Sequence, residues 1–420
     1  MTASPLPGAL SRRQALLSAL GLGITIDLVG GRAFAASEGA LARRKLVVIV
    51  CRGGLDGLSL SPPVGDPNYA ALRGKIAVAG FDQPGGALKL DGTFGLHPSM
   101  TATHALALKG QTRIAPAVAT PDRERSHFEA QDVLESGAAV VYGTSSGWLN
   151  RALAAMGPAG TVRAISVGPT APLILRGPVE AASWSPGGAA EKDHRLPGIL
   201  QDLYRNDPLL GPALASGIAT EAMAKTATAS VAMGGAGDPP PSQPIQGLAR
   251  QGLPVARKLG ATLAAFMTQP DGKQVAAVSI DGFDSHANQP ALLATRLAYV
   301  DAFIDGLQGG LGPSWDDTVV VMATEFGRTA RINGTDGTDH GTASTALLIG
   351  GGLKPGGIVG DWPTLAENRL FENRDTAPTL DMRGVFKGVL RDHLGIDRAR
   401  LDSTVFPGSA GVAAVNGIVA

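Results

Sequence analysis

The stretch that decides the fold reads Val275-Ala-Ala-Val-Ser-Ile280 and passes at once into Asp281-Gly-Phe-Asp284-Ser-His286. A second apolar run, at 318–323, is followed in the same way by Thr324-Glu325-Phe326-Gly327-Arg328. Short continuous apolar runs rich in β-branched residues are typical of strands buried on both faces in a parallel sheet. In an open parallel sheet ligands bind beyond the carboxyl ends of the strands, so we expect these polar clusters to meet at one edge.

Outward from this stretch, strands and helices alternate along most of the chain. The pattern predicts strands at 46–51, 113–118, 162–167 and 345–349, and helices at 101–108, 125–135, 147–155, 289–307 and 382–394. Such alternation predicts an α/β fold in which helices sandwich a mostly parallel sheet.

Residues 196–267 differ from the rest because their pattern is mainly helical. A Pro-rich stretch, Gly234 to Pro244, interrupts them and suits neither helix nor strand. We interpret this segment as a helical insertion or cap on a single α/β domain that spans residues 36–420.

The N-terminus reads as a targeting segment. A twin-arginine pattern, Ser11-Arg12-Arg13-Gln14-Ala15-Leu16-Leu17, precedes a moderately apolar stretch, and Ala33-Phe34-Ala35 offers a signal-peptidase site. The sequence therefore predicts a signal peptide at 1–35, which the twin-arginine export machinery recognises, and a folded protein in the periplasm or outside the cell. Asp27 argues against stable membrane insertion. The alternative is a chance Arg-Arg pair before a buried helix.

The overall composition narrows the choice of partners. Lys and Arg number 36, Asp and Glu number 36, and the formal net charge is +0, so no basic field favours nucleic acid. A single cysteine, Cys51, excludes an internal disulfide and suits a packed thiol at the end of an apolar run.

Carboxylates and imidazoles follow the strand ends where a metal or an acid/base pair would be held. Asp281, Asp284 and His286 lie within six residues, and Asp339-His340 precedes the apolar run at 345–349. These residue types at one sheet edge point to a divalent metal. The alternatives are local capping, with Asp284 or Asn288 starting the next helix, and a surface turn at 339–340.

Three arginines and three further polar residues complete the candidate set. Arg52 and Asp56 lie in a Gly-rich turn after the first strand, and planar guanidinium groups suit a phosphate, sulfate or carboxylate. Arg125 and His127 begin a helix, where Ser126 and Glu129 have the spacing of a capping box. We expect Arg52, Arg125 and Arg328 to bind an anion, and His127, Glu325 or Asp56 to transfer protons. The alternatives are a turn capped by Asp56 and a Glu325–Arg328 pair.

These residues also carry a resemblance that spans the mature domain. The motifs Arg52-Gly-Gly-Leu-Asp-Gly-Leu58, Leu96-His97-Pro98, Arg125-Ser-His-Phe-Glu-Ala-Gln-Asp132, Thr324-Glu-Phe-Gly-Arg328 and Asp339-His340-Gly341 resemble a bacterial, twin-arginine-exported family of unknown function, numbered fifteen hundred and one. That family is similar in fold to the alkaline phosphatase and sulfatase superfamily. The resemblance implies that Asp281 or Asp284 with His286, and later His340, correspond to metal ligands. Phe326 stands where the superfamily has a histidine, and Arg52 lies near the place of its first aspartate.

From these observations we expect an exported hydrolase-like protein that acts on or binds a phosphate or sulfate ester. It would hold at most one divalent ion, Zn, Mn or Ca, through Asp281, Asp284, His286, Asp339 and His340. The alternative is a non-catalytic periplasmic binding or assembly factor that has lost the metal site.

Overall fold

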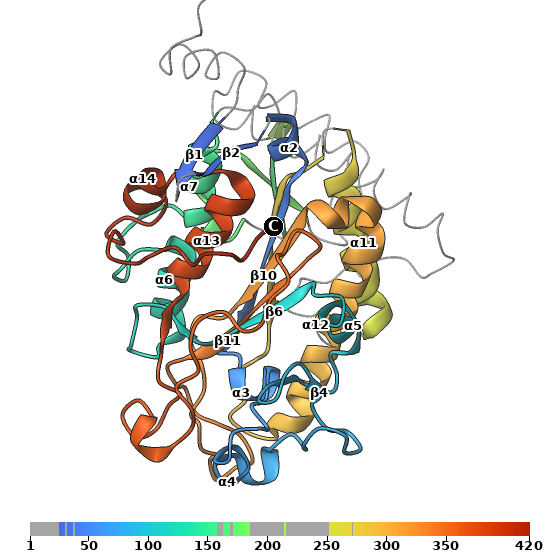
Figure 1. The fold of residues 1–420 in the computed structure, drawn as a ribbon, viewed down its shortest axis with the longest axis vertical. Helices are drawn as coiled ribbons and strands as arrows, with labels where there is room; N and C mark the ends of the chain where they lie inside the picture. The colour runs from blue at the N-terminus through green and yellow to red at the C-terminus, as the bar shows by residue number, and fades with distance from the viewer. Residues whose placement is uncertain are drawn as a thin grey trace, which may run out of the picture.

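The computed structural model describes residues 25–29, 32–36, 38–157, 163–168, 171–184, 214–215, 252–270 and 272–420. Within them an eight-stranded sheet runs through the centre of the molecule with helices on both sides (Figure 1). Its strand order is β12(Leu380–Asp381), β6(Thr112–Ala119), β11(Ser344–Ile349), β10(Thr318–Ala323), β3(Lys45–Arg52), β9(Val275–Asp281), β7(Ala164–Val167) and β8(Ala181–Trp184).

Most neighbouring strands are parallel, and one strand is reversed. β10 pairs with β3, β3 with β9, β9 with β7 and β7 with β8 in parallel, whereas β11 pairs antiparallel with both β10 and β6. The reversal brings the beginning of β11 beside the carboxyl end of β10, with Leu347 opposite Met322. The loop that precedes β11 therefore reaches the same sheet edge as the loops that follow β3, β9 and β10.

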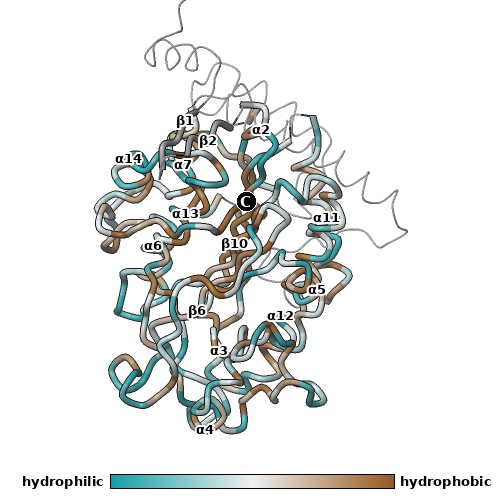
Figure 2. The backbone as a smooth tube through the Cα atoms, in the orientation of Figure 1, coloured by the Kyte–Doolittle hydropathy of each residue, from teal (hydrophilic) through white to brown (hydrophobic). Residues whose placement is uncertain are grey.

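Helices cover the two faces of the sheet separately. One face carries α5(Thr101–Ala107), α11(Leu253–Thr268) and α12(Gln289–Leu311), and the other carries α6(His127–Ser136), α7(Trp148–Ala155) and α13(Met382–Leu394) (Figure 1). β3 serves both cores, because Val47 and Ile49 pack on the first face while Leu46 and Val48 pack on the second. The hydropathy-coloured tube is brown along the central strands and paler or teal at the periphery (Figure 2). The predicted α/β fold with a mostly parallel sheet is confirmed.

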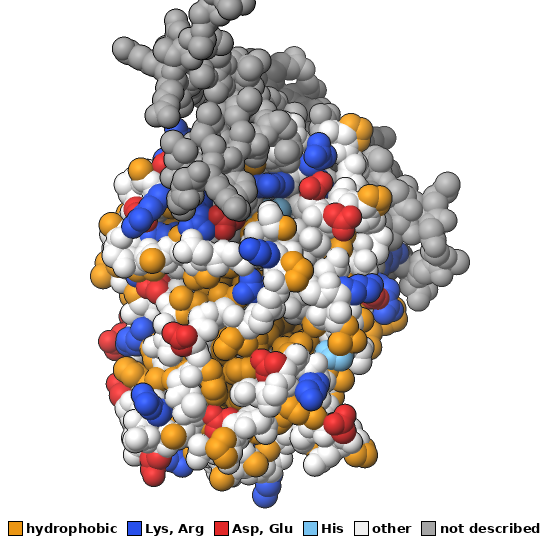
Figure 3. Space-filling view, in the orientation of Figure 1, with side chains coloured by type: hydrophobic (Ala, Val, Ile, Leu, Met, Phe, Trp, Pro, Cys, Tyr) orange, Lys and Arg blue, Asp and Glu red, His pale blue; other side chains and the backbone are white. Residues whose placement is uncertain are grey.

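Short elements gather where β3 ends. α3(Gly57–Leu60) is buried between the sheet and α4(Tyr69–Arg73), which lies at one extremity of the molecule, and β4(Leu88–Lys89) pairs with β5(Gly95–Leu96) nearby in the chain (Figure 1). The remaining short helices are α2(Glu38–Arg43) and α14(Arg398–Arg400). On the face shown in Figure 3, positive and negative side chains are interspersed, as expected from the balanced composition.

Two predicted segments fall largely outside the described residues. The twin-arginine pattern lies in residues 1–24, which are not described, while β1(Thr25–Val29) and β2(Arg32–Ala36) form a two-stranded antiparallel pair that includes the expected cleavage position. Of the predicted insertion at 196–267, residues 214–215 and 252–267 are described; the second range contains all but the last residue of α11, which packs against α12. Among the described residues no helix is long and apolar enough to cross a membrane.

Candidate functional site

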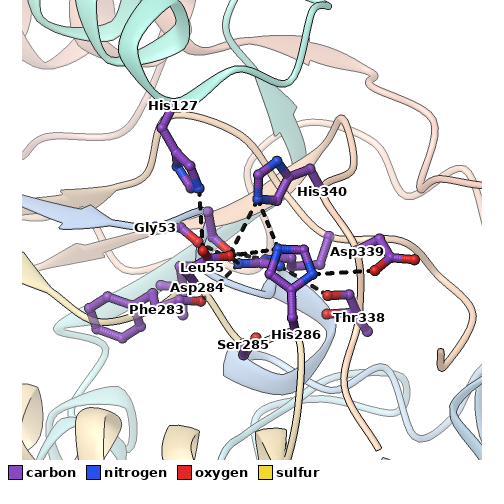
Figure 4. Close-up of polar contacts among 12 residues, drawn as sticks. Gly53, Leu55, His127, Phe283, Asp284, Ser285, His286, Thr338, Asp339 and His340 are labelled. Atoms are coloured by element: carbon purple, nitrogen blue, oxygen red, sulfur yellow. Dashed lines mark hydrogen bonds and ion pairs between the residues drawn. The ribbon is translucent and has the colours of Figure 1, made fainter. Parts of the chain in front are cut away.

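Two loops and one helix deliver polar side chains to the sheet edge at which the parallel strands end. Asp284 and His286 follow β9, and Glu325 and His340 lie in the connection from β10 to the reversed strand β11. His127 arrives from the first residue of α6, on the second face of the sheet. Figure 4 shows the rings of His127, His286 and His340 arranged around the Asp284 carboxylate.

The atoms that face one another in this cluster are ring nitrogens and carboxylate oxygens. His286 Nε2 lies 3.0 Å and His340 Nε2 lies 3.3 Å from Asp284 Oδ1, and the two ring nitrogens are 3.1 Å apart. His127 Nε2 approaches the other oxygen, Asp284 Oδ2, at 3.6 Å. His127, Asp284 and His340 alone place one ligand atom each within 4.8 Å of the others, a spacing that can hold a metal ion.

The second nitrogen of each histidine has an acceptor. His127 Nδ1 lies 3.0 Å from Glu325 Oε1, His286 Nδ1 lies 3.3 Å from Asp339 Oδ1, and His340 Nδ1 lies 2.9 Å from the carbonyl oxygen of Arg125. Carboxylates and carbonyls only accept, so each Nδ1 must donate and each neutral ring keeps its lone pair on Nε2. Metal-binding histidines are oriented by this kind of bond.

This arrangement suits a cation between the side chains. Three neutral Nε2 lone pairs would otherwise face one another and an ionised carboxylate, and His127 Nε2 is buried without a hydrogen-bond partner. A tetrahedral zinc ion with bonds of about 2.0–2.1 Å holds its ligand atoms about 3.3 Å apart. Four of the ligand-atom distances, 3.0, 3.1, 3.3 and 3.6 Å, lie near that value, although they involve both oxygens of Asp284. The set of His127, Asp284 and His340 can therefore hold one ion, with His286 beside it as a further candidate ligand.

Electrostatics set the protonation states in the cluster. The hydrogen bond with Glu325 raises the pKa of His127, while burial opposes that rise. Burial acts to raise the pKa of Glu325 and of Asp284, but hydrogen bonds, from His127 and Arg328 respectively, keep both pKa values below their ordinary range. Burial lowers the pKa of His340. Ionised carboxylates and a neutral His340 are the forms that ligate metals, whereas a proton on His127 competes with one.

Arg328 does not face an incoming anion. Its side chain is only 1% exposed, donates to the carbonyls of Gly53, Gly54 and Thr338 at 2.7–3.0 Å, and forms an ion pair with Asp284. The alternative pairing of Glu325 with Arg328 does not occur, since Glu325 is used by His127, Gly53 N, Gln131 and Thr324. Arg328 and Glu325 therefore both stabilise the site through buried hydrogen bonds.

The other two arginines are also engaged. Arg52 donates to Gln131 at 2.5 Å and pairs with Glu135, both on α6. Arg125 pairs with Glu372 at 2.6 Å and with the buried Asp375 at 3.0 Å. The structure therefore does not bring the three arginines together as an anion cradle.

Three further sequence expectations have a definite place in the structure. Asp56 is fully buried, caps α3 and pairs with Arg73, which accounts for it as the capped turn considered above. Asp281 is only partly exposed, lies opposite Arg52 in the sheet, and has a pKa raised by burial. Ser126 occupies the N-cap of α6, but its side chain makes no capping hydrogen bond, so the predicted capping box does not form.

Sequence reasoning assigned His127 to proton transfer, and the structure places it among the residues that could hold a metal ion. No spacing links it to residues 284–340; only the packing of α6 against the sheet edge brings it there. Phe326, which replaces a ligand in the resemblance, packs its ring 4.9 Å from that of His127 and 4.7 Å from that of His340. The phenyl ring supports two imidazoles instead of binding metal itself.

Comparison with known proteins gives one family. A family profile described as protein of unknown function (DUF1501) matches residues 43–405. No curated protein matches the chain.

Solved structures give distant likenesses. The lipoteichoic acid synthase LtaP from Listeria monocytogenes is 10% identical, with 94% of this chain and 81% of that chain covered and a TM-score of 0.37. The C-terminal periplasmic domain of EcEptC from Escherichia coli, in complex with Zn, is 9% identical, with 73% and 72% covered and a TM-score of 0.34. Alkaline phosphatase from the Antarctic bacterium TAB5 is 10% identical, with 73% and 90% covered and a TM-score of 0.34. TM-scores this low carry no information about the chemistry of this chain.

Proposed function

The chain belongs to the family described as protein of unknown function (DUF1501), and we propose that it is a hydrolase dependent on one divalent metal ion that acts on phosphate or sulfate esters. The observation that carries the proposal is the convergence of three histidine Nε2 atoms on the Asp284 carboxylate, at 3.0–3.6 Å, with each Nδ1 already bonded. A purely structural ion pair with Asp284 needs only one histidine. Three histidines whose Nδ1 atoms are already hydrogen-bonded suit the binding of a metal ion.

His127, His286, His340 and Asp284 would hold the ion, and their partners keep them in place. Glu325 fixes the tautomer of His127, and Arg328 holds one oxygen of Asp284. Histidine nitrogen suits Zn and similar ions, whereas Mn favours oxygen ligands and Ca takes six to eight of them. We therefore propose Zn over Mn or Ca.

A bound ion of this kind polarises an ester oxygen and lowers the pKa of a water molecule. The chain's own contribution is an entrance that remains open, since the side chains of His286 and Asp284 are 47% and 46% exposed. The buried Phe326 ring forms an apolar floor beneath His127 and His340 and keeps solvent from that side. With the three arginines engaged, an anionic ester would be attracted mainly by the ion.

Metal content and ester hydrolysis test the proposal together. The mature chain, stripped with a chelator and reloaded with Zn or Mn, should bind one equivalent by elemental analysis and hydrolyse p-nitrophenyl phosphate, bis-p-nitrophenyl phosphate or p-nitrophenyl sulfate. His127→Ala and Asp284→Ala should lose both metal and hydrolysis. His104→Ala, which changes a histidine on α5, is the matched control. A wild-type protein without stoichiometric metal refutes the proposal.

One observation favours a second function. The arginines that would have cradled an anion are occupied, which suits a metal-stabilised binding or assembly factor without turnover. Stoichiometric metal that raises the melting temperature, with none of the three esters hydrolysed, would favour that function.

We also propose that the protein is exported folded by the twin-arginine machinery and works in the periplasm or outside the cell, because Arg12 and Arg13 precede an apolar stretch and a small-residue cleavage site. Replacing both arginines by lysine should retain the precursor in the cytoplasm. Unchanged export of that variant would contradict the proposal.

A further inference from the structure

Three of the four proposed ligands sit on two loops that lack regular secondary structure, and the fourth, His127, begins α6. Asp284 and His286 belong to the loop between β9 and α12, and His340 belongs to the loop before β11. Three backbone bonds join the loops, from Thr338 N to the Ser285 carbonyl at 3.1 Å, from Asn288 N to the Thr335 carbonyl at 3.1 Å and from Gln289 N to the Asp336 carbonyl at 2.9 Å. Arg328 also bonds to both loops, at Asp284 and at the Thr338 carbonyl. Backbone bonds alone do not define the side-chain environment beneath the ligands, where a buried amide also joins the two loops.

Gln289, the first residue of α12, contacts both loops beneath the site. Its Oε1 accepts from Ser285 Oγ at 2.8 Å and from Thr338 Oγ1 at 2.6 Å. Ser285 lies between Asp284 and His286, and Thr338 lies two residues before His340. Ser285, Thr338 and Gln289 are all buried. One amide oxygen therefore joins the two loops out of contact with water.

A buried ion pair fixes which way the Gln289 amide points. Asp56 Oδ2 accepts from Gln289 Nε2 at 2.6 Å and pairs with Arg73, and neither charged side chain is exposed. Ser59 Oγ, which donates to Asp56, also lies 3.1 Å from Gln289 Nε2. A carboxylate only accepts, so the amide nitrogen must face Asp56 and the amide oxygen must face the two hydroxyls.

The opposite orientation of the amide is costly. It would place an oxygen against the Asp56 carboxylate and would leave both hydroxyls, Ser285 and Thr338, without their acceptor. An unsatisfied buried polar group destabilises a structure far more than an average hydrogen bond stabilises it. The charge of Asp56 thus determines the geometry of both loops through one side chain.

We infer that Gln289 is a positioning residue that holds the two ligand loops in register, with Asp56 and Arg73 as its anchor. The inference rests on the proposed metal site. It also assigns a role to the buried Asp56, which supports the metal site by orienting Gln289 and does not contact substrate. A merely structural Gln289, needed only to start α12, would affect overall stability and leave the relative position of the loops unchanged.

The experiment uses Gln289→Met, which keeps the volume and removes both polar functions, in the otherwise intact mature chain. Asp301→Asn is the control, because Asp301 is also a buried residue of α12 but bonds to α5 at Ala102 N and Thr103 N. Affinity for Co²⁺, read from its visible ligand-field bands, should fall about tenfold in Gln289→Met, as for the loss of an outer partner of a ligand. It should stay within twofold of wild type in Asp301→Asn.

Hydrogen exchange of the metal-free protein provides a second measurement. In Gln289→Met the amides of residues 284–288 and 336–341 should exchange at least tenfold faster than in wild type, while the amides of β3 stay as protected as in the control. Unchanged loop exchange, or faster exchange everywhere in proportion to lost stability, overturns the inference. Co²⁺ affinity equal to that of Asp301→Asn also overturns it.

Hydroxyl deletions on the two loops test whether Gln289 connects them. Ser285→Ala and Thr338→Val should each accelerate exchange in both loops, and either deletion combined with Gln289→Met should add little to the single change. Additive effects confined to the mutated loop would count against the connection. Wild-type protein that binds no Co²⁺ refutes the proposed function, whereas the exchange measurements still decide on the positioning role.

Discussion

Replacing Arg328 by methionine is expected to destabilise the protein strongly, because the guanidinium group bonds to backbone of three loops. Its Nε donates to the Gly54 carbonyl at 2.8 Å, its Nη2 to the Gly53 carbonyl at 2.7 Å and the Phe283 carbonyl at 3.3 Å, and its Nη1 to the Thr338 carbonyl at 3.0 Å. The methionine stem fills most of the volume of the arginine stem, so the change removes donors and charge more than packing.

The magnitude follows from the carbonyls left behind. Each buried acceptor without a partner costs about 1–3 kcal/mol, and three of them at the lower limit give about 3 kcal/mol. Water entering beside the half-exposed Asp284 can satisfy some of them, while removal of the buried cation returns part of its desolvation cost. The net expectation is a loss of about 3 kcal/mol, a large share of the ~5–15 kcal/mol that stabilises a typical protein.

Urea unfolding of the chelator-treated protein, followed by the fluorescence of its four tryptophans, measures the loss. Arg113→Met is the matched control, since Arg113 also donates to two carbonyls, of Gly357 and Gly417, but at a half-exposed position where water can replace it. The control should lose less than about 1 kcal/mol. If Arg328→Met and Arg113→Met unfold at the same urea concentration, the reasoning from buried carbonyls is wrong.

Three other outcomes are expected. Glu325→Gln should weaken zinc binding about 10–100-fold and lower the pKa of His127 measured by NMR, because the ionised acceptor of its Nδ1 is lost; an unchanged His127 titration would contradict this. Burial lowers the pKa of His393 to about 4, so the folded protein keeps this histidine neutral while the unfolded chain takes up a proton below pH ~6.5. The free energy of unfolding should therefore fall by up to about 3 kcal/mol as the pH drops from ~6.5 toward 4. His393→Gln should flatten that part of the stability–pH curve relative to wild type, whereas equal slopes would rule the residue out. Gly53→Ala should destabilise by more than about 1 kcal/mol, because Gly53 has φ +113° and a Cβ would overlap the backbone nitrogen of Asp284, while Gly309→Ala, in open space on α12, should be neutral or stabilising; similar melting temperatures for the two variants would contradict the steric argument.

Much of the fold follows from local pattern. The apolar runs at 275–280 and 318–323 are β9 and β10, and the helix expected at 382–394 is α13. Such elements are predictable because a strand buried on both faces, or a helix with one apolar face, leaves its period in the sequence. The same logic located Asp284 and His286 at the carboxyl edge of the sheet, whereas His340, which precedes a strand, reaches that edge because β11 runs antiparallel to β10.

The roles of individual side chains were less predictable. Arg52, Arg125 and Arg328 all suit an anion by chemistry, yet each has a carboxylate partner distant in the sequence. Asp56 has a catalytic residue type and lies in a buried ion pair with Arg73. Partner and burial depend on which loops pack together, and no short-range spacing encodes that.

The sequence by itself determined the strands, the helices and the edge of the sheet at which polar residues collect, because these depend on periodicity and on where each apolar run stops. The tertiary structure decided the composition of the site. The reversed direction of β11 carries His340 to that edge, and the packing of α6 adds His127 beside Phe326. Strand direction and helix docking are set by the burial of whole faces, so the set of three histidines and Asp284 exists only in the folded chain.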